Sequence, residues 1–138
     1  MNDDEYTFLD SNVLIYTISN DVAKKQRAVE LLDKKNVVIS TQIISESINV
    51  MYRKLNYDYS KIRRITDKFV KKATLYPITH DTIHRALNIA ETYHYAYYDS
   101  QVIASALEND CTILYSEDMQ HGQEIESSLK IVNPFVKK

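Results

Sequence analysis

The chain has 138 residues, the length of one ordinary domain, and can bury most of its apolar surface around a single core. Its composition, 44% hydrophobic and 26% charged, is that of a globular protein and excludes a disordered tail. The net charge is only −2, and the single cysteine excludes a disulfide framework and a cysteine-based zinc site.

The beginning of the chain, MNDDEYTFLD, is acidic and lacks the basic and apolar regions of a signal peptide. No apolar stretch approaches the roughly 18 residues that a membrane-spanning helix needs. We therefore expect a cytoplasmic protein without a membrane partner.

Strand-like and helical segments alternate along the chain. Runs rich in β-branched and aromatic residues predict strands at residues 6–9, 37–40, 74–78, 112–116 and 130–133. Apolar residues at helical spacing lie between them, with Ser40 or Thr41 and Thr79 as N-caps and residues 56–60 as a connection between two helices. We predict one domain over residues 1–138. Because such alternation favours parallel pairing of the strands, we expect its fold to be an α/β three-layer sandwich with a mostly parallel, roughly five-stranded sheet.

The small net charge hides a strong asymmetry. Residues 53–72 contain eight basic and two acidic residues, whereas residues 73–136 contain two basic and nine acidic ones. A helix face in contact with solvent explains the basic segment as well as a phosphate-binding patch does. If it is a patch, the residues that contact nucleic acid are Arg53, Lys54, Arg63, Arg64 and Lys68.

Four carboxylates are predicted to lie at one edge of the sheet. Asp10 follows the first strand, Glu46 lies early in the helix after the second, Asp99 begins the helix before the fourth, and Asp118 follows that strand. Strand ends and helix starts share one edge in such folds, and open α/β sheets bind ligands there. Asp10 and Asp99 also suit simple helix capping, and one acid of the pair at 117–118 suits a solvated loop, so the joint placement is the evidence.

Crowded carboxylates repel one another and lower stability unless a cation lies among them. Ligands that are all oxygen atoms suit Mg²⁺ or Mn²⁺. The acidic edge therefore predicts a hard divalent ion and phosphate-ester chemistry.

Four segments in series resemble PIN-domain ribonucleases of the VapC type, the toxins of type II toxin–antitoxin pairs. They are FLDSNVLIY, STQIISESINV, YYDSQVIASALENDCTILYSEDMQHGQ and VNPF, and the likeness covers nearly the whole chain, from residue 6 to residue 135. The resemblance implies an endoribonuclease that depends on Mg²⁺ or Mn²⁺ and leaves 5′-phosphate and 3′-hydroxyl ends. It also implies a homodimer and a cognate antitoxin protein that blocks activity.

The resemblance assigns catalysis and metal binding to Asp10, Glu46, Asp99 and Asp118, with Asn12 and Ser116 in support. Glu117 departs from the pattern and either assists a second metal position or faces water. We expect residues 116 and 118 to face the site while Glu117 points away, since side chains alternate along an extended backbone. Gly122 then lets the chain turn away from the edge.

Several alternatives remain open at this point. A haloacid-dehalogenase-type phosphatase also begins with an Asp after its first strand, but it needs a second Asp where this chain has Asn12. A non-catalytic nucleic-acid-binding module could use residues 53–72. Among other side chains, His80 and His84 have the spacing of a helical metal pair, His121 could touch a phosphate, and Tyr97 and Tyr98 could stack on bases.

Overall fold

The strands form where β-branched and aromatic residues are concentrated. The computed structural model describes residues 4–136, so the predicted domain limits at residues 1 and 138 lie outside the described part. β1 (Tyr6–Leu9) and β2 (Val37–Ser40) coincide with their predicted ranges, and β4 (Cys111–Tyr115) and β6 (Leu129–Val132) are shifted by one residue. β3 (Thr74–Tyr76) stops before Pro77, because proline has no N–H to donate to a neighbouring strand.

A short sixth strand, β5 (Glu124–Ile125), adds to the roughly five that were predicted. It pairs antiparallel with β6 after a turn in which Glu126 and Ser127 have φ angles of 52° and 58°. Hairpin turns of this kind are marked in sequences by Asn-Gly or Asp-Gly, and the pair Glu-Ser gives no such signal.

Residues 4–136 contain six helices, all of which lie between the first four strands. They are α1 (Ser11–Tyr16), α2 (Val22–Leu32), α3 (Thr41–Arg53), α4 (Tyr59–Lys72), α5 (His80–Tyr93) and α6 (Tyr97–Glu108). Ser40 rather than Thr41 caps α3, and Thr79 caps α5 within a capping box. Asp58 caps α4, which therefore starts inside the segment predicted to connect two helices.

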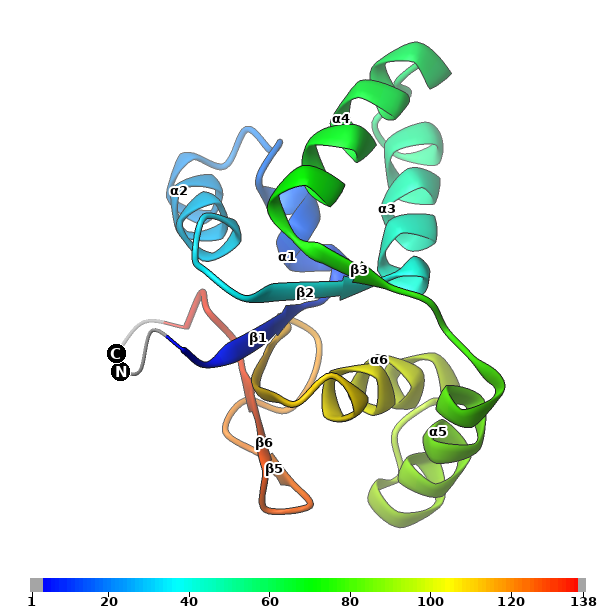
Figure 1. The fold of residues 1–138 in the computed structure, drawn as a ribbon. Coiled ribbons are helices and arrows are strands. Elements are labelled where there is room, and N and C mark those ends of the chain that lie inside the picture. The colour runs from blue at the N-terminus through cyan, green and yellow to red at the C-terminus, as the bar shows by residue number, and fades with distance from the viewer. Residues whose placement is uncertain (1–3, 137–138) are drawn as a thin grey trace.

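The sheet confirms the three-layer α/β prediction. Its strand order is β3-β2-β1-β4-β6-β5, and every pairing except that of β5 with β6 is parallel. Helices α1 to α4 cover one face and α5 and α6 cover the other (Figure 1). The chain moves outward from β1 to β3 and then returns to β4 on the other side of β1, so strand order reverses between β1 and β4. Ligands bind at such a point in open α/β sheets.

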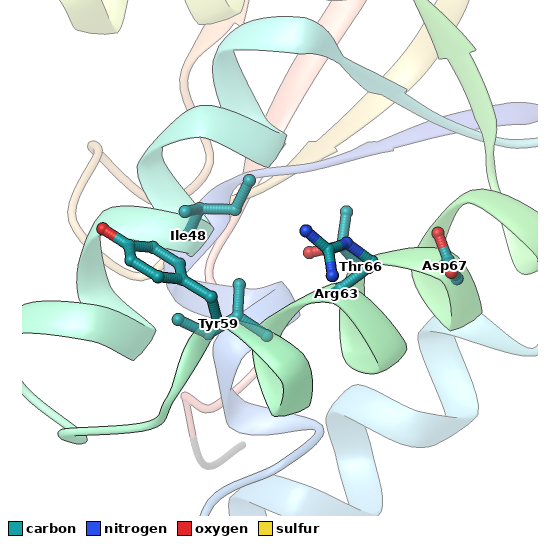
Figure 2. A pocket seen from close by; sticks show the side chains of 6 residues that line it. Ile48, Tyr59, Arg63, Thr66 and Asp67 are labelled. Carbon is teal, nitrogen blue, oxygen red and sulfur yellow. The ribbon is translucent and has the colours of Figure 1, made fainter.

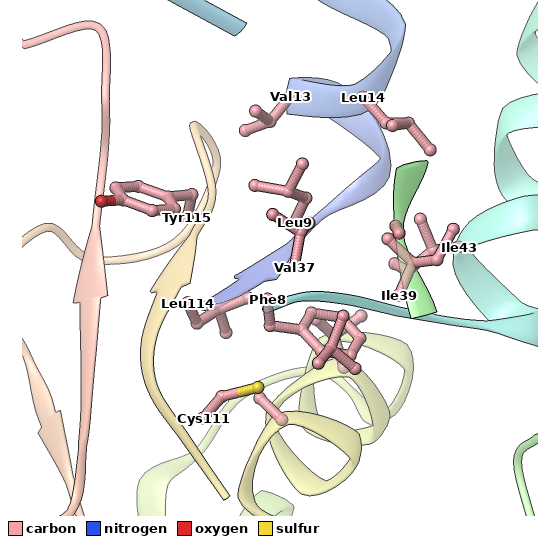
Figure 3. Packing of buried hydrophobic residues seen from close by; sticks show 14 of the residues in the cluster. Phe8, Leu9, Val13, Leu14, Val37, Ile39, Ile43, Cys111, Leu114 and Tyr115 are labelled. Atoms are coloured by element: carbon pink, nitrogen blue, oxygen red, sulfur yellow. The ribbon is translucent and has the colours of Figure 1, made fainter. Parts of the chain in front are cut away.

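The hydrophobic core lies on both sides of the two central strands. Phe8, Leu9 and Leu114 are fully buried, and Leu14 and Ile43 from the covering helices pack around them (Figure 3). Each such side chain contributes about 1.5–3 kcal/mol when it is buried. The ends of β1 and β4 are therefore firmly positioned. Within residues 4–136, no helix is both long and apolar enough to cross a membrane.

Candidate active site

Asp10 is at once the cap of a helix and a buried acid at the end of β1. Its Oδ1 accepts a hydrogen bond from the backbone of Ser11 at 2.8 Å, and its Oδ2 accepts one from Ser116 Oγ at 2.9 Å. Burial raises the pKa of Asp10 to about 6, the charges of Glu46 and Asp99 add to the rise, and the two hydrogen bonds oppose it. Asp10 is only 6% exposed. The capping interpretation is confirmed, and it does not remove Asp10 from the acidic edge.

Glu46 and Asp99 come from helices on opposite faces of the sheet. Glu46 is half-buried on α3, and Asp99 is half-buried in the first turn of α6. The N-cap of α6 is Ala96, so Asp99 does not cap the helix. Burial raises the pKa of Asp99, and the charge of Asp118 raises it further.

The four predicted acids therefore form one electrostatic group. The charges of Glu46 and Asp99 act on Asp10, and that of Asp118 acts on Asp99. Among residues 4–136, none of the four makes an ion pair with Lys, Arg or His. The repulsion among them is thus not offset by a basic side chain.

The loop after β4 shows the predicted alternation of side chains. Ser116 donates to Asp10, and Asp118 Oδ2 accepts from Asn12 Nδ2 at 3.1 Å. Asn12 also accepts through Oδ1 from the backbone N–H of Glu117 at 3.2 Å. Both ends of the Asn12 amide thus hold this loop against the start of α1.

Glu117 points the other way, into a cluster made by α1, α2 and the carboxyl-terminal segment. Its carboxylate accepts from Lys24 Nζ at 2.5 Å and from Tyr16 OH at 2.8 Å. Lys24 Nζ also lies 4.7 Å from the ring centre of Tyr16 and 5.3 Å from that of Phe135. The hydrogen bond to Glu117 raises the pKa of Lys24. Glu117 is therefore anchored in an ion pair, an arrangement that neither sequence expectation included.

Two buried amides near the acidic edge were missed by the sequence analysis. Gln42 and Gln101 are each 8% exposed, and Gln101 Nε2 donates to Gln42 Oε1 at 2.9 Å. Gln42 Nε2 in turn donates to Glu46 Oε2 at 3.2 Å. The available signal was a polar amide within an apolar helical run, as at Gln101 in SQVIASAL, because buried amides need partners.

The predicted basic residues are all exposed, but they do not share one face. Arg63 lines a groove of about 220 Å³ between α3 and α4, together with Ile48 and Tyr59 (Figure 2). Lys68 lines a second groove, on the side of α4 that faces α2. Two further lysines of the basic segment already have partners. Lys72 pairs with Asp33, and Lys61 Nζ lies 3.8 Å from the ring centre of Tyr57.

Other candidate side chains have local partners. The rings of His80 and His84 pack edge to face, with centres 4.5 Å apart. His121 Nδ1 accepts a hydrogen bond from the backbone of Asn133 at 2.9 Å. Tyr97 donates to Gln101, whereas Tyr98 is 67% exposed.

Comparison with known families decides the classification of the chain. The family model of the PIN domain matches residues 7–123. The chain belongs to the PIN domain family. The match extends over β1 to the loop after β4 and includes all four acids of the edge. No curated protein sequence matches this chain closely enough to count as a relative.

Solved structures share the PIN domain fold at low sequence identity. A toxin–antitoxin complex from Klebsiella pneumoniae has a TM-score of 0.72, 20% identity, and coverage of 94% of this chain and 98% of that one. VapBC2 from Rickettsia felis, bound to a DNA fragment from its promoter, has a TM-score of 0.68, 15% identity, and coverage of 91% and 96%. VapC20 from Mycobacterium tuberculosis, a toxin that cleaves the sarcin–ricin loop, has a TM-score of 0.64, 16% identity, and coverage of 81% of this chain and 89% of that one.

The donor chemistry of this PIN domain fits a hard divalent cation. Within residues 4–136, no three or more His, Cys, Asp or Glu side chains are arranged as a ready-made metal site. Mg²⁺ is commonly held by one or two carboxylates together with water and substrate phosphates, so it does not need such a cage. The buried Asp10 beside further uncompensated acids provides the negative charge that such an ion requires.

Proposed function

We propose that this PIN domain protein is an endoribonuclease that depends on Mg²⁺ or Mn²⁺ and acts as the toxin of a type II toxin–antitoxin pair. One observation carries the proposal. Four carboxylates with no basic partner among the described residues collect where strand order reverses. The family match and the toxins among the structural neighbours support it.

Asp10 and Asp99 would hold the ion directly, and Glu46 and Asp118 would hold it or its water molecules. When bound, such an ion lowers the pKa of a coordinated water and offsets negative charge on the phosphoryl oxygens. Ser116 keeps the Asp10 carboxylate in one orientation, and Asn12 does the same for Asp118. No side-chain nucleophile would be required: water would attack phosphorus and displace the 3′ oxygen, so one product would carry a 5′-phosphate and the other a 3′-hydroxyl.

The RNA would reach the acidic edge over exposed side chains beside it. Tyr98 precedes Asp99 and is 67% exposed, so it can stack on a base next to the scissile phosphate. Tyr97 is less suited because its hydroxyl is bound to Gln101. Arg53 ends α3, Lys54 follows it as the C-cap, and Arg63 lies on α4, so these side chains can contact phosphates further along the RNA strand.

The regulatory partner in this proposal is a small antitoxin protein, and the active form is a homodimer in the cytoplasm. Three structural neighbours are toxin–antitoxin complexes and support the antitoxin partner: the one from Klebsiella pneumoniae, VapBC2, and FitAB bound to DNA. Co-expression with the neighbouring gene, followed by purification and mass measurement, tests both the partner and the dimer.

Cleavage of RNA by the purified protein tests the activity. We expect cleavage with Mg²⁺ or Mn²⁺, none after EDTA treatment, and recovery when the ion is restored. Mapping both ends of the products checks for 5′-phosphates. RNA binding without metal-dependent cleavage would support the non-catalytic alternative. Hydrolysis of small phosphomonoesters in place of RNA would support the phosphatase alternative.

A further inference from the structure

A chain of four hydrogen-bonded side chains crosses the carboxyl edge of the sheet. Tyr97 OH donates to Gln101 Oε1 at 2.9 Å, and Gln101 Nε2 donates to Gln42 Oε1 at 2.9 Å. Gln42 Nε2 then donates to Glu46 Oε2 at 3.2 Å and to the carbonyl of Tyr98 at 3.1 Å. This row of side chains begins on α6, ends on α3, and thus links helices on opposite faces of the sheet (Figure 1).

The side-chain amides of Gln42 and Gln101 each have one permitted orientation. Gln42 faces two acceptors, the Glu46 carboxylate and the Tyr98 carbonyl, so its NH₂ group must point at them and its Oε1 at Gln101. Gln101 therefore turns its NH₂ group toward Gln42, and its Oε1 accepts from the Tyr97 hydroxyl. A flipped Gln42 would place its oxygen against two acceptors and leave buried polar atoms unpaired. The direction of donation therefore runs from Tyr97 to the Glu46 carboxylate.

This row of hydrogen-bonded side chains affects the distance between two acids of the proposed site. Glu46 belongs to α3 and Asp99 to α6, and the Gln42–Gln101 bond joins these helices next to both acids. Gln42 also binds the backbone of Tyr98, the residue before Asp99. A single side chain thus contacts the Glu46 carboxylate and the backbone that carries Asp99.

We propose that Gln42, oriented by Gln101, is a positioning residue that places Glu46 relative to Asp99 for binding of the divalent ion. The proposal rests on the proposed metal-dependent function. Gln42 uses one carboxylate oxygen, Oε2, which limits rotation of the Glu46 side chain and leaves Oε1 for the ion or its water. Groups that orient metal-binding carboxylates typically contribute tenfold to a hundredfold in metal affinity.

The test measures binding of Mn²⁺ to metal-free protein by calorimetry, together with RNA cleavage over a range of Mg²⁺ concentrations. Gln42→Met keeps the length of the side chain and removes its hydrogen bonds. We expect the Kd for Mn²⁺ and the half-saturating Mg²⁺ concentration to rise about tenfold. Cleavage at saturating metal should change less than about threefold, because the reacting groups are intact. Gln101→Met removes the bond that orients Gln42 and the bond from Tyr97, but leaves the bond between Gln42 and Glu46, and should raise the same Kd about threefold.

Two controls separate positioning from general damage to the fold. Ser47 lies next to Glu46, and its buried hydroxyl has no hydrogen-bond partner in residues 4–136. Ser47→Ala should therefore leave Mn²⁺ binding unchanged. In a Glu46→Gln background, Gln42→Met should have no further effect on Mn²⁺ affinity, because it acts through the Glu46 carboxylate. If Gln42→Met does not fold, Gln101→Met alone carries the test.

The outcomes are distinct. Wild-type protein that neither binds Mn²⁺ nor cleaves RNA would refute the proposed function and this inference with it. Wild-type protein that does both, with Gln42→Met and Gln101→Met binding Mn²⁺ equally well, would refute the inference alone. An undiminished effect of Gln42→Met in the Glu46→Gln background would also overturn it, since the effect would then not pass through Glu46.

Discussion

The candidate site has two flanks that are held together in different ways. The strand-end flank consists of Asp10, Asn12, Ser116 and Asp118, which follow β1 and β4 directly. Its acids are held by the short side chains of Ser116 and Asn12. The helix flank consists of Gln42, Glu46, Asp99 and Gln101, which lie on α3 and α6. Its geometry depends on two long amides that span the edge of the sheet.

This difference separates two contributions to one site. The strand-end flank follows β1 and β4, the two central strands, whose last residues are buried, so its position is determined by the core. The helix flank joins two layers that could shift relative to each other, so its position depends on specific hydrogen bonds. We therefore expect the strand-end flank to determine the rate of cleavage and the helix flank to tune metal affinity.

The largest expected effect is that of Asp10→Asn. The amide keeps the shape of the side chain but loses the charge that a cation needs, so RNA cleavage should fall at least about a thousandfold, or about 4 kcal/mol of transition-state stabilisation. Circular dichroism and thermal melting should show a native fold. Cleavage at the wild-type rate by the folded variant would remove Asp10, and with it the strand-end flank, from the mechanism.

The metal-free protein should also lose stability as the pH rises. The pKa of Asp10 in the folded state is about 6, above its ordinary value of 3.8. The folded state therefore binds more protons between these values. The resulting penalty is absent below about pH 4, grows through that window and is complete above about pH 7, where it reaches about 3 kcal/mol. Burial raises the pKa of Asp99 in the same direction.

Denaturant unfolding of metal-free protein between pH 4 and 7 measures this effect, with Asp10→Asn as the control. The difference in unfolding free energy between the variant and the wild type should grow with pH in favour of the variant. A difference that is constant over this range would show that the fold does not oppose ionisation of Asp10.

Asp118 and Glu117 test the boundary of the strand-end flank. Asp118→Asn should lower cleavage about a hundredfold and weaken Mn²⁺ binding, because its carboxylate lies in the acidic group. Glu117→Gln should change either quantity less than about threefold, since Glu117 is turned toward Lys24 and Tyr16. Metal titration and turnover of both variants provide the comparison. A larger effect from Glu117→Gln would mean that the Lys24 cluster, not Asp118, determines the geometry of the loop.

The strand-end flank could be predicted from the sequence, whereas the supports of the helix flank could not. Asp10 and Asp118 follow runs of strand-forming residues, and topology alone brings the ends of such strands together. Gln42 and Gln101 are 59 positions apart, and neither their bond nor the direction of their amides leaves a local pattern. The same holds for Lys24 and Glu117, which are 93 positions apart.

Turn chemistry and helix faces account for the remaining differences. β5 was not predicted because Glu126 and Ser127 adopt positive φ angles without the residues that usually mark them. Most of the basic segment lies on helices, and the helical spacing of Ile62 and Phe69 marks the buried side of α4. The sequence does not show which helix lies beside each edge of α4, so it could not tell that Arg63 faces α3 while Lys68 lies on the side toward α2.

The smallest expected effect concerns the flank over which RNA approaches. Arg63 lines the groove beside α3, the helix that carries Glu46, whereas Arg64 is its exposed neighbour on α4 and lines neither that groove nor the one beside α2. If RNA approaches over the helix flank, Arg63→Glu should weaken RNA binding about tenfold and reduce the salt slope by about one. Arg64→Glu, a charge change of the same size, should weaken binding less than about twofold. Fluorescence anisotropy with a non-cleaved RNA over a range of salt concentrations measures both variants, with Mn²⁺ affinity as the check on the site. Equal effects from the two variants would indicate a diffuse basic field without a preferred path. A larger effect from Arg64→Glu would place the RNA away from the groove between α3 and α4.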